Sequence, residues 1–299
     1  MSDATGLPPF GALTVFTEAS FALVPTVALA LTATLYLYGV QRLHRRGDAW
    51  PLVRSVCFVG LGLGTIAVAL LSGLAAYDLR LFGAHMVQHM LLSMVAPVFL
   101  ALGAPVTLAL RTLPQPLRGA LLALLHSRFA KVLSFPGIAL ALFVGSPFAL
   151  YFSGWYAATL ENPGLHDLLH LHFLAVGCLF FWPIVGVDPV PGRISHPFRM
   201  LVLFVTMPFH AFLGVAVMSV SDSGEGLIAA AHYLPLVGRA GAVHQQQIGG
   251  GLLWSSGDLV GLLFIGVAAW QWMKASEREA AREDRRLDRL EAAGQLNVP

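Results

Sequence analysis

The chain has 299 residues, of which 57% are hydrophobic and only 11% are charged. A soluble protein of this length usually carries about 25% charged residues, so the charges here are too few to cover a water-exposed surface. The composition therefore excludes an ordinary soluble protein and predicts that the lipid bilayer surrounds the chain. The net charge of +2 gives no indication of a nucleic-acid partner.

Seven apolar stretches are long enough to cross a bilayer as helices, which need about 20 residues each. They lack the alternation of barrel strands, so we predict an all-α, polytopic membrane helix bundle. The predicted spans are residues 19–40, 55–76, 84–110, 135–152, 167–187, 198–220 and 248–273. The first 20 residues contain no Lys or Arg, so we interpret the first span as a retained anchor and not a cleaved signal peptide.

The basic residues predict the orientation of the bundle. All but two of the 18 Lys and Arg, including Arg193, fall in the loops after the first, third and fifth spans and in the C-terminal tail. Because cytoplasmic loops are enriched in Lys and Arg, we predict an N-out, C-in protein of a bacterial-type inner membrane. Residues 1–274 would form the seven-helix transmembrane domain, and residues 275–299 a charged, helical cytoplasmic tail.

Smaller features predict how the helices pack. Gly60 and Gly64 are four residues apart within one span, and Gly257 and Gly261 repeat this spacing in another. Small residues at this spacing allow two membrane helices to approach closely. The leucines of residues 114–131 have the spacing of an amphipathic helix, which we expect on the cytoplasmic face.

The histidines are unevenly distributed, and eight of the 11 fall in the membrane or on its predicted outer side. His85 and His89 are four residues apart at the start of the third span. Both imidazoles therefore lie on one helical face, where they could share a metal ion. Met86 and Met90 form a neighbouring stripe, and a thioether beside imidazole is a soft ligand set that suits Cu(I). The alternative is that the histidines bind interfacial water and the methionines pack in the core.

The fifth span repeats this histidine pair at the same predicted depth. Asn162 is expected to cap the helix and Pro163 to occupy its first position. His166 and His170 follow, again four residues apart. His172 lies about 200° around the helix from His170, so it faces another helix or replaces the pair as a ligand. The recurrence favours a common site for both pairs.

Two ionisable residues lie deeper, near the middle of the sixth and seventh spans. His210 and Asp258 are costly at such depth and should face the bundle interior. Each could be a ligand, a partner that orients a ligand or part of a proton relay, and a purely structural role stays open. We expect His232 and His244 in a solvated outer loop. Together, these residues predict a histidine-lined metal or haem pocket that opens to the outer side.

Four segments resemble, in matching order, motifs of the polytopic CtaG family of cytochrome c oxidase assembly factors. They are His85-Met86-Val87-Gln88-His89-Met90 continuing to Pro105, Leu171-His172-Phe173 continuing to Gly186-Val187-Asp188-Pro189, Met207-Pro208-Phe209-His210, and Gln246-Gln247-Ile248-Gly249-Gly250 with Trp254. The resemblance covers roughly residues 80–262. One departure is Gln245, at a position where the family usually has an acidic residue.

The resemblance implies a role in assembling haem-copper cytochrome c oxidase. Our leading hypothesis is a non-enzymatic assembly factor that binds copper, expected as Cu(I), and passes it to the catalytic subunit of the oxidase. The proposed ligands are His85, His89, His166 and His170, with His210 below them. The alternatives are a membrane haem protein (a b-type cytochrome or a haem-modifying enzyme) and an ion-coupled transporter that uses His210 and Asp258. A homo-oligomer remains open.

Overall fold

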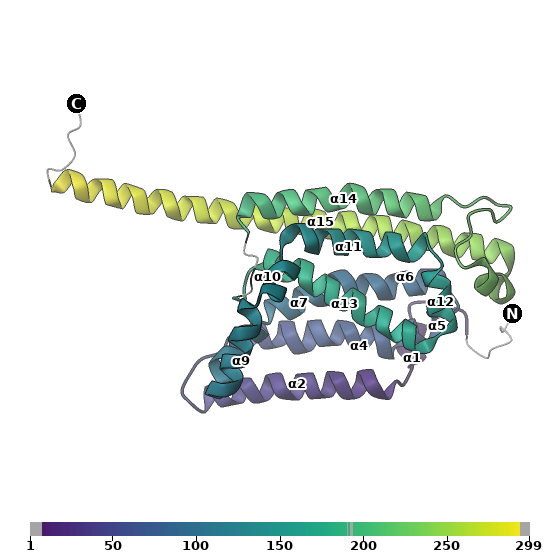
Figure 1. Cartoon of the computed structure of the whole chain (residues 1–299), viewed down its shortest axis with the longest axis horizontal. Helices are drawn as coiled ribbons and strands as arrows, with labels where there is room; N and C mark the ends of the chain where they lie inside the picture. The colour runs from purple at the N-terminus through teal and green to yellow at the C-terminus, as the bar shows by residue number, and fades with distance from the viewer. Residues whose placement is uncertain (1–7, 190, 192–193, 294–299) are drawn as a thin grey trace.

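The computed structural model describes residues 8–189, 191 and 194–293, and all regular structure among them is helical. Figure 1 shows the long helices lying side by side, with short helices at both ends of the bundle. The final part of α15 extends well beyond the other helices. The prediction of an all-α bundle is confirmed.

The helices follow one another with short connections. The first half of the bundle contains α1 (Thr14–Thr17), α2 (Leu23–His44), α3 (Leu52–Ser55), the π-helical η1 (Val56–Leu63), α4 (Gly64–Leu71), α5 (Gly73–Tyr77), α6 (Phe82–Met90), the π-helical η2 (Leu91–Val95), α7 (Ala96–Leu102) and α8 (Pro105–Thr112). The second half contains α9 (Gln115–His126), α10 (Arg128–Leu133), α11 (Pro136–Tyr151), α12 (Trp155–Glu161), α13 (Pro163–Val185), α14 (His196–Met218) and α15 (Ala230–Ala292).

Among the described residues, six helical segments are long and apolar enough to cross a membrane. Helices α11 and α12 form a pair bent by 72°, and they make a seventh span if they are counted together. The fourth predicted span, residues 135–152, corresponds to α11 alone, and the bend follows it. The N-out, C-in orientation stays a prediction, and Arg193, which contributed to it, lies outside the described residues.

The third predicted span ends earlier than residue 110. Its helix stops at Leu102, and Ala104 adopts a left-handed conformation with φ of 51° before α8 begins. Pro105 explains the break, because proline disfavours a helical conformation in the residue before it and is well suited to the first turn of a new helix.

A buried carboxylate fixes the start of α8. Asp188 is fully buried after the end of α13, and its oxygens accept hydrogen bonds from the backbone N–H of Val106 (3.1 Å) and of Thr107 (2.8 Å). The Thr107 hydroxyl and the Trp182 indole N–H also donate to it. Acidic side chains stabilise helix N-termini in this way. Asp188 therefore joins two segments far apart in the sequence.

Two of the four glycines that we singled out pack as predicted. A Cβ at Gly257 would meet the His210 side chain, and one at Gly261 would meet Met207, so both glycines bring α15 close to α14. The prediction for Gly60 and Gly64 is wrong, since a Cβ at either position would meet no other helix. The close contact in that span lies at Gly62, which packs against Leu100, because the π-helical turn there changes which residues face the neighbour.

The C-terminal helix is longer than the seventh predicted span. It begins at Ala230 and continues through the charged residues to Ala292, with a kink at Gly238, where φ is 69°. His232 and His244 therefore lie on α15, and their expected position in an outer loop is wrong. The expected amphipathic helix of residues 114–131 is divided into α9 and α10. The division of the chain at residue 274 stays a prediction, because no helix end marks it.

Gly177 offers a test of the contact between α13 and the third span. A methyl group there would collide with the Ser93 carbonyl oxygen and the Pro97 ring, whereas one at Gly145 of α11 would meet nothing within 4 Å. We expect Gly177→Ala to lower the free energy of unfolding by about 1–3 kcal/mol through overpacking. Gly145→Ala should be neutral or stabilising, since alanine favours helix by about 0.5–1 kcal/mol. Thermal unfolding in detergent would measure both, and equal melting temperatures would contradict this packing.

Candidate metal centre

Four imidazoles meet at one end of the bundle. His85 and His89 lie on the short helix α6, and His166 and His170 lie in the first two turns of α13. The ring centroids are 3.9 Å apart in the first pair and 4.5 Å apart in the second. Across the two helices, His85 and His166 are 5.6 Å apart, and His89 and His170 are 5.8 Å apart. All four side chains are buried. Helical spacing and helix packing thus bring both pairs into one cluster.

Local sequence explains why α13 begins where it does. The Asn162 side chain accepts hydrogen bonds from the backbone N–H of Gly164 and Leu165, and Pro163 occupies the first turn. This cap confirms the predicted start of the helix. It places His166 and His170 in the first two turns, level with the first turns of α6.

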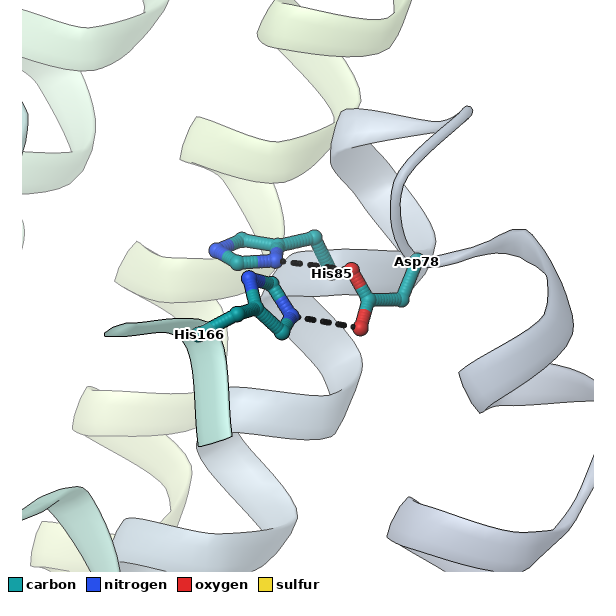
Figure 2. A group of neighbouring side chains, drawn as sticks. All are labelled: Asp78, His85 and His166. Atoms are coloured by element: carbon teal, nitrogen blue, oxygen red, sulfur yellow. Dashed lines mark hydrogen bonds and ion pairs between the residues drawn. The ribbon is translucent and has the colours of Figure 1, made fainter. Parts of the chain in front are cut away.

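Asp78 lies at the centre of the cluster, and our sequence analysis missed it. It is buried in the turn between α5 and α6. One carboxylate oxygen is 3.3 Å from His85 Nδ1, and the other is 2.8 Å from His166 Nε2 and 3.9 Å from His170 Nε2. Figure 2 shows the carboxylate beside the rings of His85 and His166, with one oxygen directed at each. The only signal in the sequence was an acidic residue seven positions before His85, in an apparent loop.

The charge of Asp78 is stabilised by its partners. Burial alone would raise the pKa of this carboxyl group, but the hydrogen bonds from His166 and His85 outweigh that effect and hold the pKa well below its usual range. Asp78 is therefore a carboxylate that only accepts hydrogen bonds. Both histidines must donate to it.

This direction of hydrogen bonding determines two tautomers. If His85 donates from Nδ1 and His166 from Nε2, the neutral rings carry their lone pairs on His85 Nε2 and His166 Nδ1. Both of these nitrogens are buried without a hydrogen-bond partner. In Figure 2, they are the ring nitrogens without a dashed line to Asp78.

A second chain of hydrogen bonds, through Tyr151 and Met86, determines the tautomer of His89. Its Nδ1 is 3.1 Å from the hydroxyl oxygen of Tyr151 on α11, and that hydroxyl donates to the Met86 sulfur at 3.7 Å. If the one hydroxyl proton of Tyr151 goes to the Met86 sulfur, His89 Nδ1 is the donor to the Tyr151 oxygen. The lone pair of His89 then lies on Nε2, which is also buried and unpartnered.

The cluster therefore presents buried nitrogen atoms that lack partners. They are His85 Nε2, His89 Nε2, His166 Nδ1 and His170 Nε2. Leaving a buried polar atom unsatisfied costs about 1–3 kcal/mol, and coordination of a metal ion would satisfy several of them at once. Ligand atoms of Asp78, His85 and His166 all lie within 4.8 Å of one another. Asp78 could thus bind an ion itself or orient the imidazoles that do.

Three of the predicted site residues lie outside this cluster. His172 faces away on α13, where its Nε2 is 2.9 Å from the Ser146 hydroxyl. His210 is buried on α14, and its Nδ1 donates to a backbone carbonyl of its own helix. Asp258 accepts a hydrogen bond of 2.7 Å from the Trp254 indole N–H. Each therefore has a local partner.

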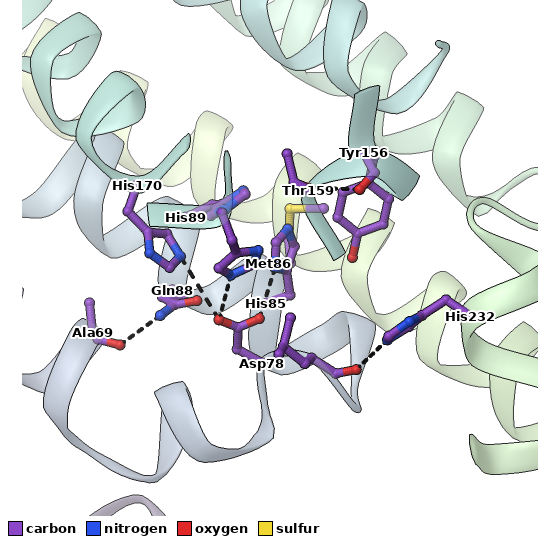
Figure 3. Close-up of polar contacts among 12 residues, drawn as sticks. Ala69, Asp78, His85, Met86, Gln88, His89, Tyr156, Thr159, His170 and His232 are labelled. Atoms are coloured by element: carbon purple, nitrogen blue, oxygen red, sulfur yellow. Dashed lines mark hydrogen bonds and ion pairs between the residues drawn. The ribbon is translucent and has the colours of Figure 1, made fainter. Parts of the chain in front are cut away.

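The two predicted methionine ligands, Met86 and Met90, also lie in different surroundings. Met86, labelled in Figure 3, is fully buried, and its sulfur accepts from the Tyr151 hydroxyl that also contacts His89. Met90 is only partly buried and packs against the apolar core. Only Met86 brings a thioether to the cluster.

Helix α15 supports the start of α6. The Gln245 side-chain oxygen accepts a hydrogen bond of 3.3 Å from the Gly83 N–H in the first turn of α6. The next residue, Gln246, accepts a hydrogen bond from the Ile228 N–H and donates to the carbonyls of Val217 on α14 and of Gly226 in the loop before α15. An amide oxygen in this chain thus accepts from the α6 N-terminus at the position where a carboxylate is usual in the resembled family.

Comparison with known proteins identifies relatives of this chain. Residues 34–275 match the family described as cytochrome c oxidase caa3 assembly factor. Uncharacterized proteins of Mycobacterium bovis and Mycobacterium tuberculosis are each 39% identical over 260 residues, which is 85% of this chain and 39% of theirs. One from Mycobacterium leprae is 37% identical over 271 residues, 88% of this chain and 40% of its own. The chain spans about two-fifths of the length of these curated relatives. No solved structure matches it.

The hydrogen-bond network predicts the tautomers of the metal-free protein. We expect His85 and His89 to be protonated at Nδ1 and His166 at Nε2, because their acceptors are Asp78 and the Tyr151 oxygen. Nitrogen-15 NMR of protein labelled on histidine would distinguish the tautomers by their ring shifts. Tyr151→Phe should alter the signals of His89 and leave those of His166 unchanged. Identical spectra for the variant and the parent would contradict the hydrogen bond between His89 and Tyr151.

Proposed function

Because the chain belongs to the family of cytochrome c oxidase caa3 assembly factors, we propose that it binds copper in the buried histidine cluster and helps deliver it to the catalytic subunit of the oxidase. The family match confirms the resemblance of the four sequence segments. The observation that supports a metal site is the group of unpartnered imidazole nitrogens around Asp78. In this proposal the ion is cargo, and the protein is not an enzyme.

The chemistry of the donors favours copper. Imidazole nitrogen suits Cu, Zn, Fe and Ni, whereas a thioether selects for Cu(I) among these ions. Met86 places its sulfur 3.7 Å from the Tyr151 hydroxyl, which in turn contacts His89. An oxygen-rich site for Mg²⁺ or Ca²⁺ would need several carboxylates, and Asp78 alone occupies this one. Neutral imidazoles also allow release by ligand exchange, since no thiolate holds the ion.

The packing of the cluster favours a single ion over haem. A macrocycle held between imidazoles needs an open slot beside the rings. His89 instead packs against Phe173 with centroids 4.6 Å apart, and His85 packs against Tyr156 at 4.9 Å. An ion fits among these rings without displacing them.

The position of the cluster suits transfer to a partner. It lies at the end of the bundle where α6 and α13 begin, opposite the end from which the charged part of α15 emerges (Figure 1). The positive-inside rule would place this end on the extracytoplasmic side. Copper held there would face an oxidase domain on the same side of the membrane.

Copper binding can be tested with paired variants. We expect detergent-purified protein, loaded with copper under ascorbate, to retain about one Cu(I) per chain. His85→Ala with His89→Ala, and separately His166→Ala with His170→Ala, should lose it, because each pair removes two ligands. His172→Ala is the matched control, since it lies on α13 but outside the cluster. Metal content by mass spectrometry and competition with a chromogenic Cu(I) chelator would measure binding.

The same samples give the contradicting outcomes. Copper retained in both double variants would exclude this cluster as the site. A Soret band in the parent that disappears in either double variant would establish a haem protein instead. In cells, the double variants should lower cytochrome c oxidase activity, while His172→Ala should preserve it.

A further inference from the structure

A large cavity extends from the histidine cluster along the side of the bundle. Its volume is about 930 Å³, and it lies between α2, α4, α7 and α13. Along α13 it reaches from His166 to Trp182, which is about 24 Å of helix at 1.5 Å per residue. Helix α2 packs chiefly against α8 and α4, which leaves this space beside α13. The cavity therefore runs through most of the roughly 30 Å hydrocarbon layer.

The cavity is apolar along its length and polar at one end. Leu29, Leu63, Leu100 and Leu174 are among the residues of its apolar wall. Most of the ionisable and amide side chains line the end near the cluster, and they are Asp78, Gln88, His166, Asp167 and His170. No Lys or Arg is among the residues that line the cavity.

Gln88 has an unused hydrogen-bond acceptor at this polar end. It is fully buried, and its side-chain N–H donates to the Ala69 carbonyl at 2.9 Å, as Figure 3 shows. The Gln88 Oε1 atom has no partner. A buried amide oxygen of this kind requires a donor, and the neighbouring Asp78 carboxylate cannot supply one. A ligand that ends here should therefore carry an O–H or N–H group.

The mouth of the cavity faces the lipid. Leu168 and Leu171 on α13 and Val24 on α2 line it and are 58%, 61% and 78% exposed. Three exposed apolar side chains at the rim would admit a membrane-dissolved molecule sideways from the bilayer. A route from water to the deep part of the cavity would not have such a rim.

The size of the cavity and the charge of its lining limit which molecules could occupy it. Ligand pockets range from about 300 to 1,000 Å³, and this cavity of about 930 Å³ lies within that range. The cavity therefore suits a single amphiphile. An anionic phospholipid head would meet the Asp78 carboxylate without a balancing cation, which is unfavourable in a buried site.

We propose that this cavity binds an isoprenoid hydroquinone of the membrane, with its tail along α13 and a ring hydroxyl donating to Gln88 Oε1. The tail would replace lipid against the apolar wall, and the uncharged head would need no counterion. This site does not depend on copper binding, because Gln88 belongs to the cavity and not to the proposed ligand set.

Calorimetric titration of the metal-free, detergent-purified chain with a decyl-substituted benzohydroquinone would test the proposal. Leu171→Trp should block the mouth, and Gln88→Leu should remove the acceptor, so each should weaken binding by about tenfold or more. Leu201→Trp, at a similarly exposed position on α14, is the matched control and should bind as the parent does. The oxidised quinone, which has no donor, should bind at least about tenfold more weakly than the hydroquinone.

Each other outcome would overturn the proposal. Equal affinity of the parent and Leu171→Trp would show that the hydroquinone does not use this cavity, even if Gln88→Leu fails to fold. Equal affinity for quinone and hydroquinone would remove the role of Gln88 as an acceptor. Displacement of the hydroquinone by phosphatidylethanolamine at equal concentration would identify a structural lipid site. Copper content is measured separately, so failure here leaves the metal proposal standing.

Discussion

The candidate centre depends on one buried carboxylate. Asp78 lies in a turn, yet its two oxygens accept hydrogen bonds from His85 on α6 and His166 on α13. These bonds offset the cost of burying the charge, and they determine which nitrogen of each ring stays free. Without Asp78, both rings could rotate or change tautomer. A single residue outside the helices thus orders ligands from two of them.

Close helix packing makes this arrangement possible. Gly177 lets α13 approach the carbonyl of Ser93 in η2, and Gly249 lets α15 approach the Phe82 ring in α6. Both contacts lie near the cluster along their helices, so the histidine-bearing segments are held from either side. Asp188 joins α13 to α8 at the other end of the bundle. The bundle therefore fixes the position of α13 at both ends, while α2 remains loosely packed beside the cavity.

Metal binding and amphiphile binding would share one end of the protein but use different atoms. The proposed copper ligands are imidazole nitrogens between α6 and α13, whereas the cavity lies on the side of α13 that faces α2. Gln88 comes from the same helix as His85 and His89, but its side chain donates to the Ala69 carbonyl on α4 and is not one of the proposed copper ligands.

The sequence by itself determined the helical class, most of the spans and the two histidine pairs, because hydrophobic length and a spacing of four residues are local properties of a helix. Only the tertiary structure decided that the pairs meet, that Asp78 joins them and that His172 and His210 do not. The sequence places Asp78 in a loop without periodicity, and its role depends on a partner 88 residues away. The contact at Gly62 likewise appears only in the structure, because the π-helical turn there changes which residues face the neighbouring helix.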